Sequence, residues 1–209
     1  ITPAWSFNGF ISGDTSATIA YTGRNYNTAN VTSANLITVS GLSITSVAGS
    51  NSSAPEDYVL DSTTKTANAT ITPKTVSLAV APKVYDASTD MTGYVSITTG
   101  VGSETLTYNG ATSNDAHVAT ADKYLNAITL GNASDGSGGL ASNYQLPTLN
   151  AANALVTINP KTLTLTLTNS GYSQVYDGDA AADITPAWSF NGFISGDTSA
   201  LINLSLIHI

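Results

Sequence analysis

The chain has 209 residues, of which 42% are hydrophobic and only 10% are charged, and its net charge is −8. This length and hydrophobic fraction allow packed cores in one large domain or in two to three small ones. The acidic balance and the scattered lysines and arginine argue against a nucleic-acid partner and against binding to an anionic membrane surface. The absence of cysteine excludes disulfides, thiolate zinc sites and cysteine nucleophiles.

The sequence repeats at two distances. Residues 1–17 are identical to residues 184–200, an offset of 183. A shorter offset of 87 relates Pro73 to Pro160, and one of 91 relates Tyr85-Asp86 to Tyr176-Asp177. These offsets predict a basic repeat of about 87 to 91 residues, with two diverged repeats making up the longer period.

The positions of the repeated motifs predict the limits of each repeat. We expect a first repeat over residues 1–72, a complete second repeat over 73–159 and a C-terminally truncated third repeat over 160–203. The first repeat opens on the equivalent of Ile184, which lies 24 positions into the third. We therefore expect the first repeat to lack its opening strand and Tyr-Asp turn, and the chain to be part of a longer array.

The last residues break the pattern. Residues 204–209 resemble the translation of a transposase adapter that is used in sequencing libraries, and they are expected to be a non-native tail. The alternative is a natural apolar edge strand.

The alternation of apolar and small polar residues predicts strands throughout. It is clearest over residues 75–80 and over 162–168, where Leu163, Leu165 and Leu167 are expected to form one buried face. Further strands are predicted over residues 94–98, 104–108, 127–130, 144–146 and 154–158. Residues 149–154 tolerate a helix, but a loop is favoured there.

The expected fold class is all-β, as tandem small β-rich modules of β-grasp-like or β-sandwich-like type in an elongated array. A continuous β-solenoid is the rival architecture, but no repeat of the expected rung length is visible inside the repeat. Pro73 and Pro160 each lie between two strands and are predicted to be stiff hinges between modules. Lys74 and Lys161 follow them, and solvated lysines at a module joint are favoured over an intramolecular Lys–Asn cross-link.

Motifs that carry chemistry are missing. The sequence has no nucleophile elbow, P-loop, dinucleotide fingerprint or zinc-protease motif, and Glu56 and Glu104 lie in different repeats. We expect no catalytic residue, no cofactor and no metal. Aspartates such as Asp135 in a glycine-rich loop leave Ca²⁺ binding open, although turn formation is the favoured role.

A repeated aromatic pair is the one candidate ligand site. Trp5 and Phe7 recur as Trp188 and Phe190, and each pair alternates as on one strand face. Core packing is favoured for this segment, and a carbohydrate-binding platform is the alternative.

The order of motifs resembles the YDG and MBG-type repeats of large bacterial surface proteins, including filamentous-haemagglutinin-like adhesins. The matching residues are Tyr176-Asp177-Gly178, Gly196-Asp197, Tyr108-Asn-Gly110, Asn143-Tyr144-Gln-Leu146 and Ile158-Asn-Pro160-Lys161. The second repeat departs from the pattern with Ala87 in place of glycine, which argues against a turn with positive φ there.

This resemblance implies secretion to the bacterial cell surface, in association with the outer membrane, and a role in an adhesin or its stalk. The implied partners are neighbouring repeats of the same chain and, in the alternative, a host or matrix glycan or protein. It implies no catalytic residue and no direct membrane insertion.

Overall fold

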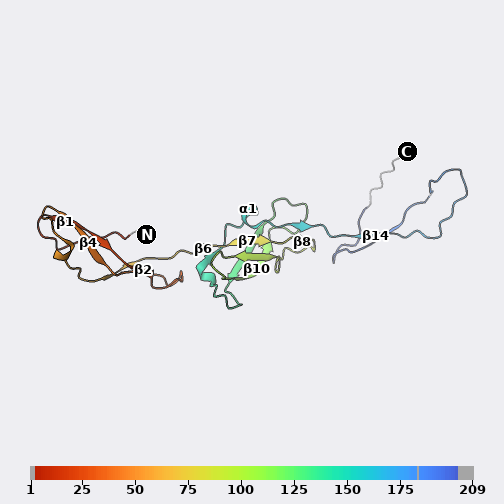
Figure 1. The fold of residues 1–209 in the computed structure, drawn as a ribbon. Helices are drawn as coiled ribbons and strands as arrows, with labels where there is room; N and C mark the ends of the chain where they lie inside the picture. The colour runs from red at the N-terminus through yellow and green to blue at the C-terminus, as the bar shows by residue number, and fades with distance from the viewer. Residues whose placement is uncertain (1–2, 183, 202–209) are drawn as a thin grey trace. The chain divides into compact units, whose positions relative to one another are not determined.

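The computed structural model describes residues 3–182 and 184–201 (Figure 1). These residues form mostly short β-strands with very little helix, so the predicted all-β class is confirmed at that level. They divide into two compact units. The first unit comprises the described residues up to Thr75 together with Gly139–Gln145, and the second comprises Val76–Gly138 together with the described residues from Leu146 onward. Tandem modules in an elongated array stay a prediction.

The first unit is built from antiparallel pairs and one short parallel pair. Its elements are β1 (Asp14–Ala20), β2 (Gly23–Tyr26), β3 (Leu36–Ser40), β4 (Ser43–Gly49), η1 (Pro55–Asp57), β5 (Thr64–Asn68), β6 (Lys74–Thr75), η2 (Ala141–Asn143) and β12 (Tyr144–Gln145). Strands β2, β3 and β5 form an antiparallel sheet and β1 pairs with β4, whereas β6 and β12 run parallel.

A buried carboxylate ties β1 to residues on both sides of η1. Asp14 is 8% exposed, and its Oδ2 accepts hydrogen bonds from the Tyr58 hydroxyl at 2.6 Å and the Ser53 hydroxyl at 2.7 Å. The bond from Tyr58, followed by that from Ser53, lowers the pKa of Asp14, and the same carboxylate raises the pKa of Tyr58. The carboxylate therefore stays ionised and holds this corner of the unit closed.

The second unit also mixes antiparallel and parallel pairs. Its elements are β7 (Ser77–Val80), β8 (Lys83–Val84), β9 (Val95–Thr98), β10 (Thr107–Ser113), β11 (Leu125–Gly131), α1 (Ala151–Ala154), β13 (Ile158–Asn159), β14 (Thr164–Leu167) and β15 (Trp188–Asn191). The antiparallel pairs are β7–β9, β10–β11 and β14–β15, and the parallel pair is β8–β13.

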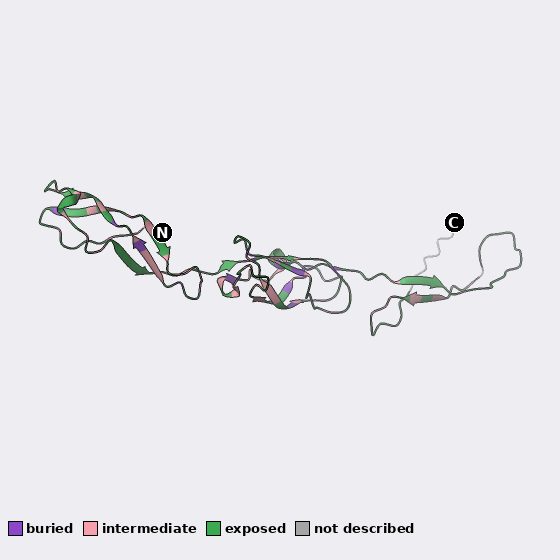
Figure 2. Ribbon diagram, turned by 60° about the horizontal axis from the view of Figure 1, so that its bottom comes forward, coloured by how far each residue is buried: buried purple, intermediate pink, exposed green. Residues whose placement is uncertain are grey.

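A hydrophobic core of buried residues lies in the second unit (Figure 2). Met91 and Leu125 are fully buried at its centre, and Leu78 and Val80 of β7 pack against it. Its buried members are Met91, Val95, Ala111, Leu125, Ile128, Ala154, Val156 and Ile158. Residues from the entering and the leaving ends of the second repeat thus share one core.

Three predicted elements differ from those observed. Of the strand predicted over 154–158, only Ile158 lies in β13, because Ala154 is the last residue of α1. The strand predicted over 104–108 begins at Thr107 and extends to Ser113, because Gly110 at φ 64° allows a register shift within β10. The loop predicted over 149–154 contains the helix α1. Its start is stabilised by Asn150, whose side chain accepts hydrogen bonds from the backbone N–H groups of Ala152 and Asn153.

The predicted buried face of residues 162–168 is wrong for two of its leucines. Leu165 is 44% exposed and Leu167 is 51% exposed, although β14 forms as a strand. Within the described residues β14 pairs with β15 alone, and a two-stranded ribbon covers little of either face. The equivalent β7 is covered because a complete core lies beneath it.

The repeat boundaries stay predictions. The division between the units follows Thr75, close to the limit predicted after Thr72. Gly139–Gln145, however, belongs with the first unit, and no division separates Pro160 from the residues before it. The predicted tail over 204–209 lies outside the described residues.

Candidate functional site

The Tyr-Asp turns occur twice with the same hydrogen bonds. In the second repeat the Ser88 N–H donates to Asp86 Oδ1 at 2.9 Å. In the third, 91 residues later, the Asp179 N–H donates to Asp177 Oδ1 at 3.2 Å. The next bond also recurs, since the Asp90 N–H donates to Ser88 Oγ and the Ala181 N–H donates to Asp179 Oδ1. These are short side-chain-to-backbone turns, which is the role that favours Asp at such positions.

The backbone of both turns is left-handed at the third motif position. Gly178 has φ 94° and Ala87 has φ 63°. The expectation that Ala87 argues against a positive φ is therefore wrong. The surrounding hydrogen bonds hold alanine in a conformation that glycine would adopt with less strain.

Lys83 was not singled out in the sequence, yet it organises the first of these turns. It is 4% exposed, its Nζ lies 2.8 Å from Asp86 Oδ1, and it donates to the carbonyls of Ser88 and Asp90 at 3.0 and 2.7 Å. Burial raises the pKa of Asp86, but hydrogen bonds from Lys83 and Ser88 outweigh it, so the net shift is downward. All three ammonium protons have acceptors, which offsets the cost of burying this side chain.

Gln174 occupies the place of Lys83 in the third repeat. Its Nε2 donates to Asp177 Oδ2 at 2.6 Å and to the Ala181 carbonyl at 3.1 Å. The Asp179 backbone N–H, followed by the Gln174 side chain, lowers the pKa of Asp177. The offset of 91 residues could have identified this pair in the sequence, because Lys83 and Gln174 each lie two positions before the tyrosine of their motif.

The tyrosines of the two motifs have different surroundings. Tyr85 packs against the core and its ring lies 6.0 Å from that of His117, whereas Tyr176 is 91% exposed. The predicted hinge residues Pro73, Lys74, Pro160 and Lys161 are all exposed. Pro160 and Lys161 border a shallow hollow of about 270 Å³ beside Tyr85. None of this brings the motif residues together into a catalytic cluster.

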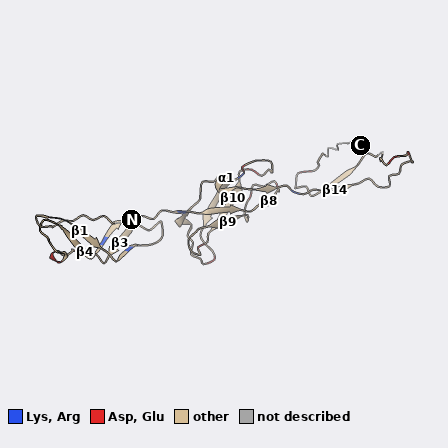
Figure 3. Ribbon diagram, turned by 45° about the horizontal axis from the view of Figure 1, so that its top comes forward, with Lys and Arg blue, Asp and Glu red and all other residues tan. Residues whose placement is uncertain are grey.

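Asp135, the candidate Ca²⁺ ligand, accepts hydrogen bonds from its own unit. Asp135 Oδ2 accepts from the Thr105 hydroxyl at 2.7 Å and Oδ1 accepts from the Ser137 N–H at 3.0 Å, which lowers the pKa of Asp135 to about 2. Among the described residues no three acidic or histidine side chains gather as a metal site would require. Figure 3 shows basic and acidic positions distributed along the ribbon, without a concentrated basic segment.

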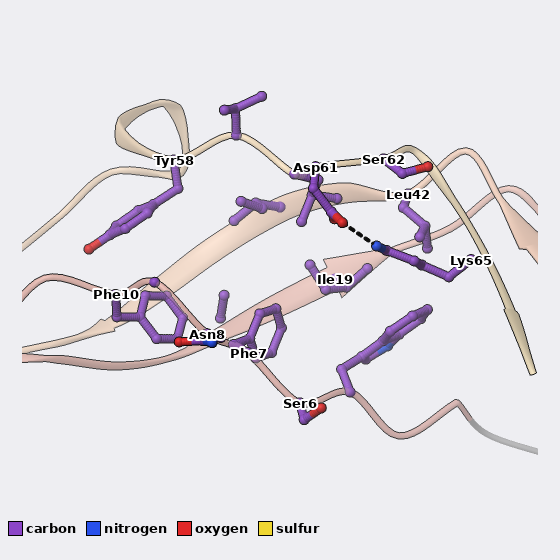
Figure 4. Close-up of a pocket in the computed structure, with 16 residues that line it drawn as sticks. Ser6, Phe7, Asn8, Phe10, Ile19, Leu42, Tyr58, Asp61, Ser62 and Lys65 are labelled. Carbon is purple, nitrogen blue, oxygen red and sulfur yellow. Dashed lines mark hydrogen bonds and ion pairs between the residues drawn. The ribbon is translucent and has the colours of Figure 1, made fainter.

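The first aromatic pair borders an open cavity of about 500 Å³ in the first unit (Figure 4). Its apolar lining comprises Trp5, Phe7, Phe10, Ile19, Leu42 and Ile44. The Phe10 ring contacts the rings of Phe7 and Tyr58, with centroids 5.6 and 5.4 Å apart. At the rim Lys65 forms an ion pair with Asp61 and holds the pKa of that carboxyl below its ordinary value.

The second aromatic pair lies in a strand. Trp188 and Phe190 belong to β15 and stand opposite Leu167 and Leu165 of β14. Both are half-buried, so they face the apolar side of the hairpin. The core packing expected for the Trp-x-Phe segment, and the carbohydrate-binding alternative, both stay predictions.

No protein-family model, curated protein or solved structure matches this chain. Where the structure describes the chain, it contains no helix that is long and apolar enough to cross a membrane.

Proposed function

We propose that this chain is a stalk or spacer segment of a secreted bacterial surface adhesin, built from repeats of the YDG/MBG type and without catalytic activity. Its work is mechanical, in that each repeat separates or presents a more distal part of the protein. The partners are neighbouring repeats of the same chain, and the location is the outside of the cell in association with the outer membrane. The recurrence of the Lys83 and Gln174 networks supports a repeated structural unit.

The parallel pairing of β8 with β13 is the observation that carries this proposal. The Lys83 N–H donates to the Thr157 carbonyl at 3.0 Å and the Tyr85 N–H donates to the Asn159 carbonyl at 2.9 Å. Strand β8 follows β6 and β7 near the start of the predicted second repeat, and β13 is the last strand before its predicted end. Tension along the chain therefore draws two parallel strands in opposite directions and loads their hydrogen bonds together, not one after another.

A second parallel pair has the same geometry in the first unit. Tyr144 pairs with Lys74 and Gln145 pairs with Thr75, and the Gln145 side chain donates to the Thr75 hydroxyl at 2.9 Å. Again a strand near the start of the second repeat lies beside one near its end. A segment of this kind resists extension because separating its ends requires sliding the strands past each other.

Stretching single molecules by their two ends tests the proposal. Rupture of the β8–β13 pair frees the residues from Tyr85 to Thr157, which at about 3.3–3.6 Å each add roughly 25 nm of chain. We expect a discrete rupture followed by an extension of this size, and the same rupture again after relaxation. Smooth extension without a discrete event would contradict a mechanical role.

Glycan or mucin binding by the Trp-x-Phe segment is the alternative. It is favoured by the open cavity beside Trp5 and Phe7, whose rim carries Asn8, Asp61 and Lys65. Screening immobilised glycans with the parent and with Trp5→Ala separates the two functions. Binding that the substitution abolishes would establish the alternative, and no binding by either protein leaves the spacer role in place.

A further inference from the structure

Residues 139–145, called the docking segment below, belong to the first unit although they come from the second half of the predicted second repeat. They contain η2 and β12, whereas the residues on either side of them, Gly138 and Leu146, belong to the second unit. The stretch before them is rich in glycine, and Gly136 and Gly138 have φ of 79° and 86°, which lets the backbone turn there without strain. The chain therefore leaves the second unit, contributes one short segment to the first and returns.

Asn143, the last residue of η2, holds the docking segment to a loop of the first repeat. Its Oδ1 accepts a hydrogen bond from the Val31 N–H at 2.9 Å, and its Nδ2 donates to Asn30 Oδ1 at 3.1 Å. A backbone N–H can only donate, so the oxygen of Asn143 faces Val31 and its nitrogen faces Asn30. One side chain thus donates to one residue and accepts from its neighbour, and these two residues lie 113 and 112 positions earlier in the sequence.

The loop that receives Asn143 is closed by hydrogen bonds of its own. The Asn30 N–H donates to the Thr28 hydroxyl at 3.2 Å, and the Asn30 carbonyl accepts from the N–H groups of Ser33 and Ala34 at 3.1 and 2.8 Å. Ala34, at the end of this turn, is 4% exposed. Residues 28–34, called the receiving loop below, are therefore fixed by contacts that do not involve Asn143, so little ordering has to accompany the contact with it.

The two residues after Asn143 pair with the start of the predicted second repeat. Tyr144 pairs with Lys74 and Gln145 pairs with Thr75, and Tyr144 is 7% exposed. The docking segment is thus held to the first unit at two places. The strand pairing uses backbone groups, which almost any sequence supplies. The choice of the receiving loop therefore depends on the side chain of Asn143.

We propose that the receiving loop is a docking site for the η2–β12 segment of the following repeat, and that Asn143 is the residue that recognises it. The partner is a neighbouring repeat of the same chain, and the recognition group is a carboxamide that donates and accepts together. Opening of the first unit then requires release of a segment that is continuous with the second, so each unit stabilises the other. The inference rests on the repeat organisation in the proposed function. Because docking is measured without load, its failure would leave the rupture of the β8–β13 pair untouched.

Substitutions on both sides of the contact test the docking in the whole chain. Asn143→Leu keeps the approximate size of the side chain and removes both hydrogen bonds. Asn30→Ala removes only the bond from Asn143 Nδ2. Asn126→Leu is the matched control, because Asn126 Oδ1 accepts from the Thr112 hydroxyl at 2.8 Å within the second unit. Circular dichroism checks that each variant keeps the strand content of the parent.

Hydrogen exchange of single amides, followed by nuclear magnetic resonance, gives the result. In Asn143→Leu we expect the Val31 N–H to exchange about tenfold faster than in the parent, because its acceptor is lost. The Tyr144 N–H, which donates to the Ala141 carbonyl, should exchange about fivefold faster because the docking segment is released. Asn30→Ala should speed exchange at Tyr144 by about threefold, although the substitution lies in the other repeat. The control should change both rates by less than about twofold.

Combining the two substitutions shows whether they act through one contact. In a chain that already carries Asn143→Leu, Asn30→Ala should change exchange at Tyr144 by less than about twofold, because the bond between them is already lost. The proposal is overturned if Asn143→Leu leaves exchange at Val31 unchanged. It is equally overturned if Asn30→Ala leaves exchange at Tyr144 unchanged, since the docking segment would then be held by its own repeat alone. Acceleration of the same size in Asn126→Leu would also overturn it, because loss of any amide contact would then have this effect.

Discussion

Gln174 stands 91 residues after Lys83 and makes two of its contacts. The Lys83 ammonium lies 2.8 Å from Asp86 and donates to the Asp90 carbonyl, and the Gln174 amide donates to the equivalent Asp177 and Ala181. A charged and a neutral side chain thus close the same turn. Both side chains place an N–H donor within hydrogen-bond distance of the same turn. This indicates that the turn requires a hydrogen-bond donor and does not require a charge.

Substitutions of Lys83 separate these two properties. Lys83→Met leaves the carbonyls of Ser88 and Asp90 without their donor, and it is expected to lower the free energy of unfolding of the second unit by roughly 1–3 kcal/mol. Lys83→Gln restores the side chain of the third repeat and should cost about 1 kcal/mol or less. Urea unfolding measures both, and equal losses would show that the charge is needed.

The strained turn at Ala87 predicts a stabilising change. Ala87→Gly relieves the left-handed backbone and should stabilise its turn by roughly 1 kcal/mol, while Gly178→Ala should destabilise the equivalent turn by a similar amount. Hydrogen exchange of the Asp90 and Ala181 amides reports each turn separately. We expect about fivefold slower exchange at Asp90 in the first variant and about fivefold faster exchange at Ala181 in the second. Faster exchange at Asp90 in Ala87→Gly, or slower exchange at Ala181 in Gly178→Ala, would show that the left-handed backbone at Ala87 is not strained.

The core of the second unit predicts at which positions a substitution by alanine lowers the free energy of unfolding. Met91 is fully buried, so Met91→Ala should lower the free energy of unfolding by about 2–5 kcal/mol. Val175 is 88% exposed, so Val175→Ala should stay within about 0.5 kcal/mol of the parent. Chemical denaturation of the two variants, followed by tryptophan fluorescence and circular dichroism, makes the comparison. Similar values for both would mean that Met91 is not at the centre of a cooperative core.

The hydrogen bonds to Asp135 predict a contribution to folding stability that is lost at acidic pH. Thr105 and then Ser137 lower the pKa of Asp135 from 3.8 to about 2. A carboxyl whose pKa is lower in the folded state adds stability that is fully present above its unfolded pKa and is lost as the pH falls towards its folded pKa. The unfolding temperature of the parent should therefore fall between about pH 4 and pH 2 by more than that of Thr105→Val. Parallel curves for the two proteins would contradict this assignment.

Alternation and spacing predicted the parts of the fold that depend on local sequence. The alternation over 75–80 and 162–168 predicted β7 and β14, because period two is a property of the strand itself. The offset of 91 residues predicted that Tyr85-Asp86 and Tyr176-Asp177 are equivalent, and their turns have the same hydrogen bonds.

The parts that were missed depend on partners far away in the sequence. The burial of Leu165 and Leu167 was predicted from alternation, which cannot tell whether a core lies beneath the strand. Trp188 lies in β15, whereas Trp5 lies outside the described strands, although the two segments have the same sequence. Lys83 was missed because the equivalent residue in the third repeat is Gln174, so the two positions do not match in sequence. Both side chains nevertheless supply the N–H donor that the turn needs.

Changing the direction of pull on the β8–β13 pair tests the mechanical account most directly. The chain has no cysteine, so introduced cysteines provide unique attachment points. Ala81→Cys with Lys161→Cys pulls the two parallel strands from opposite ends, whereas Ala81→Cys with Thr157→Cys pulls them from the same end. All three positions are exposed, and the freed lengths of chain are nearly equal.

The account predicts a rupture force several-fold higher for attachment at 81 and 161 than for attachment at 81 and 157, because the first geometry loads the hydrogen bonds together and the second breaks them in turn. Equal forces, or a lower force for the first pair, would contradict the claim that the parallel pairing of the entering and leaving strands carries tension.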